Sequence, residues 1–403
     1  MMEEQGLGIA EQPPRERRAL RPLTAPPEWH PELPDLLGLM PDEVTVLIEG
    51  MGYPAYRARQ LLQWLHGHAL TDPRLITVLP AELRKRLGSE TFIACPEVAA
   101  RQADAVDGTV KYLFRLADGE TVETVLMRYR FGYSLCVSSQ VGCRMGCRFC
   151  ASTIGGLRRN LRASEMVAQV LAVQRDLLGG KVSAPPPEPG EQPPEEDQAA
   201  GPRFDRISRI VVMGMGEPLE NLEAVVRFAR IVHLPEGCGI GWRHITVSTS
   251  GLVPAIDQLR EEGLPITLAI SLHAPNDELR DRLMPINRRY PLAQLMPVCR
   301  RYQEATGRRL TFEYVMIGGT NDLHEHALEL GRMLRGMICH VNLIPLNPVK
   351  ERPELKPSAP EAMEAFRSVL RGQGIPATVR RQLGTSIDAA CGQLRRRVGA
   401  GVR

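Results

Sequence analysis

Three cysteines stand close together in this chain of 403 residues, with the spacing C-x-x-x-C-x-x-C. They are Cys143, Cys147 and Cys150, and no second C-x-x-C or C-x-x-H pair follows them. Three thiolates can bind three irons of an iron–sulfur cube and leave the fourth iron open, as reductive chemistry with S-adenosylmethionine (SAM) requires. The spacing therefore favours a [4Fe–4S] cluster over a zinc knuckle with a distant fourth ligand or three buried thiols.

The cysteines follow the first of several short β-branched segments that alternate with amphipathic helical stretches. The expected strands are Ser134–Ser138, Ile207–Met213, His244–Ser248, Ile266–Leu272, Leu310–Met316, Val341–Pro345 and Ala377–Arg381. The expected helices are Ala163–Leu178, Leu219–Val232, Val253–Glu262, Leu292–Ala305, Asp322–Leu334 and Ala359–Gly372. Repeated strand–helix units predict an α/β fold with a buried parallel sheet, and their number suits a full or partial (β/α) barrel of the TIM type.

Polar residues gather where these strands end. In (β/α) barrels the chemistry takes place at the carboxyl ends of the strands, and the cysteine loop follows the first strand at that end. The residues at the ends of the later strands include Gly216, Glu217, Ser248, Ser271, Leu272, His273 and Asn347. We therefore expect them to surround one site together with the cysteines.

Other segments flank or interrupt the predicted barrel, which spans 131–394. Residues 34–98 show helical periodicity and predict a small accessory domain, whereas alternation over 99–130 predicts two or three antiparallel strands with a turn at Asp118-Gly119. Residues 1–33 are expected to form a disordered leader and 395–403 a basic tail. The acidic, Pro-rich segment 183–202 cannot bury a core, so it predicts a flexible insertion.

The composition is that of a globular protein, with 43% hydrophobic and 24% charged residues. No apolar run reaches the roughly 18 residues of a membrane span, and the N-terminus has no apolar segment of a secretory signal. The nine cysteines are clustered rather than paired, which favours a reducing cytoplasm over a disulfide framework. Repeated arginine doublets suit a phosphate-rich partner such as RNA, although solvated helix faces explain any single pair equally well.

Six segments, in order, resemble the motifs of the RlmN/Cfr family of radical-SAM methyltransferases, which act on RNA adenine. These segments are Leu135–Cys143, Met213–Pro218, Val247–Gly251, Ala269–Asp277, Asn342–Pro348 and Ile387–Leu394. The resemblance runs from about Pro34 to Leu394, with the acidic segment as an insertion. It implies a radical-SAM partial (β/α) barrel with a small N-terminal helical domain.

The resemblance also implies a role for the residues at the strand ends. Cys143, Cys147 and Cys150 would hold one [4Fe–4S] cluster. Gly216 and Glu217 would receive the amino group of SAM, since a carboxylate pairs with an ammonium group. The remaining residues implied to line the SAM pocket are Ser248, Ser271, Leu272, His273 and Asn347.

Three further residues would carry the reaction of this family, which uses two SAM molecules per turnover. Cys391 would be methylated by the first SAM, and a radical from the second would convert this methyl group into a methylene that adds to the adenine. Glu123 would remove the ring proton, and Cys136 would release the product by forming a disulfide with Cys391. Without the resemblance, Cys391 and Cys136 would be interpreted as buried thiols, and Glu123 as an exposed strand glutamate.

The implied activity is methylation of carbon 2 of an adenosine in 23S rRNA, at the peptidyl-transferase centre, and of an adenosine in tRNA. Methylation at carbon 8, the sister activity that confers antibiotic resistance, shares all these motifs. A zinc-dependent RNA-binding module without catalysis is an alternative of another class. The expected partners are 23S rRNA, tRNA and an electron donor such as flavodoxin or ferredoxin, for a monomer without membrane contact.

Overall fold

The computed structural model describes residues 32–129, 131–182, 206–384, 387 and 394–395. Nearly all of the predicted leader, the acidic insertion, Cys391 and most of the basic tail lie outside these residues. None of the described helices is long and apolar enough to cross a membrane.

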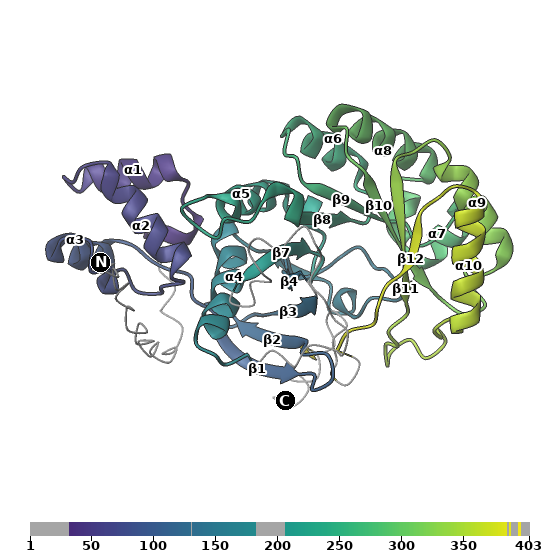
Figure 1. Cartoon of the computed structure of the whole chain (residues 1–403), viewed down its shortest axis with the longest axis horizontal. Coiled ribbons are helices and arrows are strands. Elements are labelled where there is room, and N and C mark those ends of the chain that lie inside the picture. The colour runs from purple at the N-terminus through teal and green to yellow at the C-terminus, as the bar shows by residue number, and fades with distance from the viewer. Residues whose placement is uncertain (1–31, 130, 183–205, 385–386, 388–393, 396–403) are drawn as a thin grey trace, which may run out of the picture.

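One ten-stranded sheet organises the described chain, in the order β1-β2-β3-β4-β7-β8-β9-β10-β11-β12 (Figure 1). From β4 onward all neighbours pair in parallel. The parallel strands are β4 (Gly132–Cys136), β7 (Ile207–Val212), β8 (Ile245–Thr249), β9 (Thr267–Ser271), β10 (Leu310–Met316), β11 (Cys339–Pro345) and β12 (Ala377–Val379). Within the described residues β12 pairs only with β11, so the barrel is partial, as predicted.

Helices cover the outer face of the parallel strands (Figure 1). They are α4 (Ala163–Leu178), α5 (Leu222–His233), α6 (Val253–Glu261), α7 (Asp277–Leu283), α8 (Leu292–Thr306), α9 (His324–Leu334) and α10 (Pro360–Gly372). β10 is buried along most of its length because it has a parallel neighbour on each side and lies under these helices. Such strands appear in a sequence as continuous apolar runs, which is why the sequence located them.

Two local elements were missed by the sequence analysis. One is α7, which begins after Asn276, whose side chain accepts a hydrogen bond from the Leu279 N–H at 3.0 Å. Asp277 and Glu278 occupy its first turn, a pattern typical of a helix start. The other is a hairpin of β5 (Gln140–Gly142) and β6 (Leu157–Asn160), which brackets the cysteine loop.

The predicted antiparallel segment consists of three strands, β1 (Glu97–Ala103), β2 (Val110–Arg115) and β3 (Thr121–Tyr129). The turn between β2 and β3 contains Gly119 at φ +84°, a conformation that favours glycine. β3 pairs antiparallel with β4, so these strands continue the barrel sheet rather than forming a separate one.

The N-terminal helices pack against the barrel at one end of the molecule (Figure 1). They are α1 (Pro41–Gly50), α2 (Tyr56–Gly67) and α3 (Ala81–Glu90), with the short 3₁₀ helices η1 (Leu36–Gly38) and η2 (Pro73–Leu75). Leu36 and Leu37 of η1 are buried in the hydrophobic core that also contains α4. Arg227 of α5 donates a hydrogen bond to the Gly38 carbonyl and forms an ion pair with Glu43 of α1.

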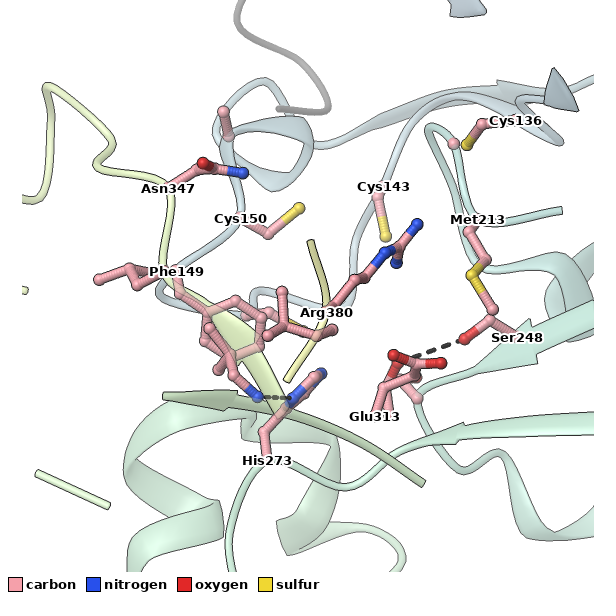
Figure 2. Close-up of a pocket in the computed structure, with 18 of the residues that line it drawn as sticks. Cys136, Cys143, Phe149, Cys150, Met213, Ser248, His273, Glu313, Asn347 and Arg380 are labelled. Atoms are coloured by element: carbon pink, nitrogen blue, oxygen red, sulfur yellow. Dashed lines mark hydrogen bonds between the residues drawn. The ribbon is translucent and has the colours of Figure 1, made fainter. Parts of the chain in front are cut away.

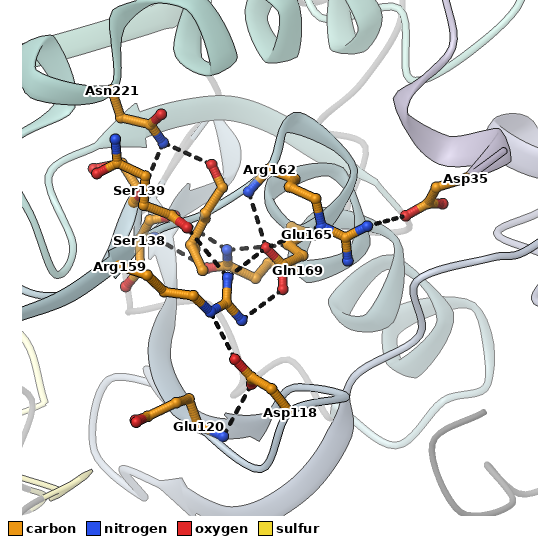
Figure 3. Close-up of polar contacts among 12 residues, drawn as sticks. Asp35, Asp118, Glu120, Ser138, Ser139, Arg159, Arg162, Glu165, Gln169 and Asn221 are labelled. Atoms are coloured by element: carbon orange, nitrogen blue, oxygen red, sulfur yellow. Dashed lines mark hydrogen bonds and ion pairs between the residues drawn. The ribbon is translucent and has the colours of Figure 1, made fainter. Parts of the chain in front are cut away.

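Gln169 of α4 joins the barrel to the antiparallel strands (Figure 3). The fully buried amide oxygen accepts hydrogen bonds from the Thr124 hydroxyl at 2.8 Å and the Ser138 N–H at 3.0 Å. The amide nitrogen donates to the Ser138 carbonyl at 3.1 Å. Ser138 follows β4 and precedes the cysteine loop, so this side chain holds the point from which the loop departs.

Replacing Gln169 with Ala is expected to lower the free energy of unfolding by about 3 kcal/mol, because it leaves several buried polar groups without a partner. Urea denaturation followed by circular dichroism measures this change. The matched control is Gln258→Ala on the exposed face of α6, which should be neutral within about 0.5 kcal/mol. Equal stability of the two variants would contradict this role of Gln169.

Candidate active site

A cavity of about 360 Å³ opens at the carboxyl ends of the parallel strands (Figure 2). Most of the residues singled out from the sequence line it: Cys136, Cys143, Cys147, Cys150, Gly216, Glu217, Ser248, Ser271, His273 and Asn347. Leu272 does not, because its side chain is fully buried in the main hydrophobic core. Side chains alternate between the two faces of a strand, so Ser271 turns toward the cavity and Leu272 turns away from it.

Tight turns bring the three cysteines to this cavity. A side chain at Gly142, where φ is +80°, would place its Cβ 1.9 Å from the Gly156 carbonyl oxygen, so only glycine fits there. The Cys143 N–H donates to that same carbonyl at 3.1 Å. At the far side of the loop, the Thr153 hydroxyl donates to the carbonyls of Cys147 and Cys150.

Salt bridges anchor the hairpin that follows the loop (Figure 3). Arg159 of β6 pairs with Glu165 of α4 through two hydrogen bonds of 2.9 Å, and with Asp118 at 2.7 Å. Arg162 interacts with Asp35 of the N-terminal region at 3.6 Å. The cysteine loop is therefore tied to the N-terminal region, to the antiparallel strands and to the barrel.

The three thiols match the ligand set of an iron–sulfur cluster. Burial, together with the neighbouring thiols and Glu217, raises the pKa of Cys143 to about 12 and that of Cys147 well above its usual value. Bare thiolates are unfavourable in such a place, whereas thiolates bound to iron are stabilised by the metal. Within the described residues no three His, Cys, Asp or Glu side chains surround a single-ion site, but each thiol of a cubane binds a different iron.

Glu217 ties together two of the loops above the strands. Its carboxylate accepts hydrogen bonds from the Ser250 N–H at 2.7 Å and the Leu219 N–H at 3.1 Å. Burial raises its pKa, and these hydrogen bonds lower it in part. A buried carboxylate in the cavity wall is a suitable acceptor for the ammonium group of a ligand. Gly216 precedes it at φ +110° and passes so close to Gln140 that a Cβ would lie 2.6 Å from that side chain.

His273 has a strained backbone and a defined tautomer. Its φ of +59° is unusual for a residue other than glycine. The Val315 N–H donates to Nδ1 at 2.9 Å, so Nδ1 is unprotonated and Nε2 carries the proton. Asn321 holds this conformation by donating to the His273 carbonyl at 2.8 Å, and Phe149 packs edge-on against the imidazole ring.

Cys136 and Glu123 lie on one face of the sheet, but only Cys136 lines the cavity. Cys136 is paired with Val125, which lies two residues after Glu123 and on the same side of β3. The buried Glu123 carboxylate forms an ion pair with Lys111 at 2.9 Å and accepts a hydrogen bond from the Arg395 N–H at 2.7 Å. The described end of the chain therefore returns to Glu123, whereas Cys391 lies outside the described residues.

Four charged residues of the site were missed by the sequence analysis. Glu313, Arg380 and Arg381 line the cavity. Arg280 is fully buried beside it, where it interacts electrostatically with Cys147. A glutamate within the otherwise apolar run of β10 was a usable signal for Glu313. Nothing in the sequence marked Arg280, because an arginine on a short amphipathic helix is expected to be exposed.

Comparison with known proteins identifies the family. Residues 137–331 match the model of the radical SAM superfamily, and residues 34–93 match that of the ribosomal RNA large subunit methyltransferase N-terminal domain. The chain is 50% identical over 362 residues to a protein of Symbiobacterium thermophilum named "Probable dual-specificity RNA methyltransferase RlmN", covering 90% of this chain and 91% of that one. A protein of the same name from Geobacillus kaustophilus is 47% identical, over 91% and 94% of the two chains.

The chain belongs to the RlmN family of radical-SAM methyltransferases. A crystal structure of a radical SAM methyltransferase from Sphaerobacter thermophilus matches with a TM-score of 0.79 and 46% identity, covering 89% of this chain and 98% of that chain. The predicted fold class, enzyme class and cofactors, a [4Fe–4S] cluster and SAM, are therefore confirmed. The alternative prediction, a zinc-dependent RNA-binding module without catalysis, is wrong. The roles of individual residues in the RlmN family reaction remain predictions for this chain.

Burial lowers the pKa of His273 from 6.5 to about 3, which makes the stability of the fold depend on pH. As the pH falls below 6.5, the unfolded chain takes up a proton at this histidine and the folded chain does not. The free energy of unfolding should therefore fall by up to about 1.4 kcal/mol per pH unit through His273, down to the folded pKa. His273→Asn, which tolerates the positive φ, should make this slope shallower, whereas the exposed control His324→Asn should not.

Urea denaturation of the metal-free proteins between pH 4 and pH 7 measures how steeply the free energy of unfolding changes with pH. Metal-free protein is used for all three forms because acid also destroys iron–sulfur clusters. Identical slopes for the parent protein and His273→Asn would contradict the neutral, buried state of His273.

Proposed function

We propose that this chain methylates carbon 2 of an adenosine in 23S rRNA, and of an adenosine in tRNA, through a methylated Cys391. RNA methylation of the RlmN type follows from the family, and the position and the carrier cysteine are the proposal. One observation carries it: Cys136 lines the same cavity as the three cysteines of the loop, and on the same face of the sheet Glu123 binds Arg395, which follows Cys391 in the chain.

The residues around the cavity divide into two groups. Cys143, Cys147 and Cys150 would hold the cluster, which when bound supplies the one-electron reduction that cleaves SAM. The loop of Gly216 and Glu217 would receive the amino group of SAM, because a carboxylate that lines the cavity can accept hydrogen bonds from an ammonium group. Ser248, Ser271, His273 and Asn347 would line the rest of the SAM pocket.

The carrier chemistry would take place on two thiols. Cys391 as thiolate displaces S-adenosylhomocysteine from a first SAM, so that an S–CH₃ bond forms and the sulfonium S–CH₃ bond breaks. Loss of a hydrogen atom from this methyl group to the 5′-deoxyadenosyl radical leaves a methylene that bonds to carbon 2 of the adenine. The cluster, when bound, would take back one electron from this adduct, and Glu123 would take the proton from carbon 2. The Cys136 thiolate then attacks the sulfur of Cys391; the S–CH₂ bond breaks, the carbon takes up a proton and a disulfide remains.

The surroundings of Glu123 support its role as a base. Lys111, fully buried, forms an ion pair of 2.9 Å with the carboxylate and so orients it. The hydrogen bond from the Arg395 N–H fixes the other oxygen. Glu123 does not line the cavity in this arrangement, so its role as a base requires that the carboxylate becomes exposed when RNA binds.

The remaining features of the proposal concern partners and organisation. We propose a cytoplasmic monomer that takes electrons from a donor such as flavodoxin or ferredoxin. We also propose that 34–98 forms an accessory unit for RNA docking, 99–130 a β extension, and 131–394 the catalytic barrel. The match of 34–93 to a ribosomal RNA methyltransferase N-terminal domain supports the first of these units.

Anaerobic incubation of the reconstituted enzyme with SAM, a reductant and either 23S rRNA fragments or tRNA tests the proposed activity. Mass spectrometry of the digested nucleosides, against authentic standards, should find 2-methyladenosine from both RNAs. Finding 8-methyladenosine instead would assign the sister activity. Product from only one RNA would restrict the substrate to that RNA.

Cys147→Ala should lose the cluster and all methylation while the barrel remains folded, because one of three iron ligands is gone. Iron and sulfide analysis measures the cluster, and circular dichroism measures the fold. The matched control is Cys299→Ala, which removes a thiol fully buried in α8 and should keep full iron content. Full iron content in Cys147→Ala would refute the cluster assignment.

Cys136→Ala should stop the reaction at the last step, since it removes only the thiol that releases the product. The variant should accumulate a covalent protein–RNA adduct that survives a denaturing gel. Cys339→Ala, which removes another buried thiol, on β11, should turn over normally. Normal turnover without trapped RNA in Cys136→Ala would exclude Cys136 from the mechanism.

A further inference from the structure

Arg280 of α7 is a fully buried cation whose hydrogen-bond partners are all neutral. Its Nε donates to the Leu272 carbonyl at 3.1 Å, and its Nη2 donates to the carbonyls of Ser250 and Ser271 at 2.7 and 3.2 Å. Its Nη1 donates to the Asn287 amide oxygen at 2.7 Å. Within the described residues the guanidinium forms no ion pair with a carboxylate.

A buried charge in neutral surroundings is costly, so the positive charge of Arg280 favours a nearby anion. The carboxylates of Asp277 and Asp281 accept hydrogen bonds from the Asn287 amide nitrogen, at 2.9 and 2.7 Å, rather than from the guanidinium. Burial lowers the pKa of Arg280 only to about 10, so the side chain is charged at neutral pH. The described chain thus maintains a buried cation without a carboxylate in direct contact.

The helix that carries Arg280 packs against the cysteine loop. The Arg148 N–H of that loop donates to the carbonyl of Leu283, the last residue of α7, at 3.0 Å. The Leu283 side chain belongs to a small hydrophobic cluster that also contains Cys143 and Cys147. Arg280 lies one turn before Leu283, and among its anionic neighbours the Cys147 thiolate raises its pKa most. The nearest candidate for the missing anion is therefore whatever the thiolates of the loop hold.

We propose that Arg280 raises the reduction potential of the iron–sulfur cluster by stabilising its reduced form. This inference rests on the proposed assignment of Cys143, Cys147 and Cys150 as the cluster ligands. Arg280 does not line the cavity, and most of its N–H donors are already used by backbone carbonyls and Asn287. It therefore acts on the cluster through its charge and not as a ligand.

The charge of the cluster gives the direction of the effect. Three thiolates around a [4Fe–4S]²⁺ core carry a net charge of −1, and one electron from the reduced donor changes this charge to −2. A positive charge in surroundings of low dielectric constant stabilises the more negative state more strongly. Arg280 thus makes the cluster easier to reduce by a donor such as flavodoxin or ferredoxin, the step that precedes cleavage of SAM.

A redox titration followed by electron paramagnetic resonance tests the proposal on the reconstituted full-length enzyme without SAM. The reduced cluster is paramagnetic, so its signal measures the reduction potential without any turnover. Arg280→Gln should make the cluster about tenfold harder to reduce, which lowers the potential by about 59 mV. Iron and sulfide analysis shows that each variant holds its cluster.

Arg280→Lys separates the charge from the hydrogen bonds. Lysine keeps the positive charge but lacks the planar fork of donors that binds the carbonyls. Its potential should differ from that of the parent enzyme by less than half of the shift in Arg280→Gln. Equal shifts in the two variants would mean that the hydrogen bonds set the potential, and would overturn the inference.

Asp281→Asn provides a test of opposite sign, which decides the matter if Arg280→Gln does not fold or loses its iron. Asp281 interacts electrostatically with Arg280, and asparagine keeps an oxygen that can accept from Asn287. Removal of this negative charge should raise the potential. The matched control is Arg282→Gln at an exposed position of the same helix, where water and salt screen the charge, so its potential should equal that of the parent enzyme.

The remaining outcomes distinguish failure of the inference from failure of the cluster assignment. An unchanged potential in Arg280→Gln with full iron content, or in Asp281→Asn, would refute the inference and leave the cluster ligands as proposed. Full iron content in Cys147→Ala, or a parent enzyme that binds no iron, would refute the assignment of the three cysteines, and the inference with it.

Discussion

Where parallel strands end, backbone N–H and C=O groups no longer have hydrogen-bond partners in the sheet. In this protein such groups surround a buried cavity. Four buried side chains satisfy these groups. Gln169 binds the backbone of Ser138, and Glu217 accepts from two N–H groups of neighbouring loops. Arg280 donates to the carbonyls of Ser250, Ser271 and Leu272.

Asn321 completes this set by donating hydrogen bonds to the carbonyls of His273 and Val315. Because an unsatisfied buried group costs about 1–3 kcal/mol, the loops that carry the cysteines and the other cavity-lining residues depend on these side chains. The same arrangement makes the site rigid before any ligand binds. Rigid loops are what a reaction through a reactive radical requires, since the reacting atoms must already be in place.

The burial that shapes the site also makes its charged groups complementary to ligands. The thiols of Cys143 and Cys147 are unfavourable as bare anions, and the Arg280 guanidinium interacts with Cys147 from within the protein. A cubane held by three thiolates carries net negative charge, so a buried cation beside it is favourable. Glu217 and Glu313 are two further buried charged groups that line the same cavity.

Part of the site was predictable from local sequence. The cysteine spacing predicted the cluster, and the apolar runs predicted the parallel strands, because strands buried on both faces are apolar throughout. Helix α4 has the bounds predicted for it, Ala163–Leu178, since its apolar periodicity is not interrupted. The order of strand-end motifs, together with the resemblance, predicted which residues would gather at one end of the sheet.

Tertiary structure alone decided which side chains reach the cavity and what each one contacts. Glu123 is paired with Lys111 on the neighbouring strand, and its second oxygen is bound by Arg395, 272 residues away in the chain. Leu272 faces the core although its neighbours face the cavity. Local periodicity reports which face of an element is buried, but not which distant element covers it or how deep a residue lies. Those depend on the strand order and on the return of the chain end, which are set by long-range packing.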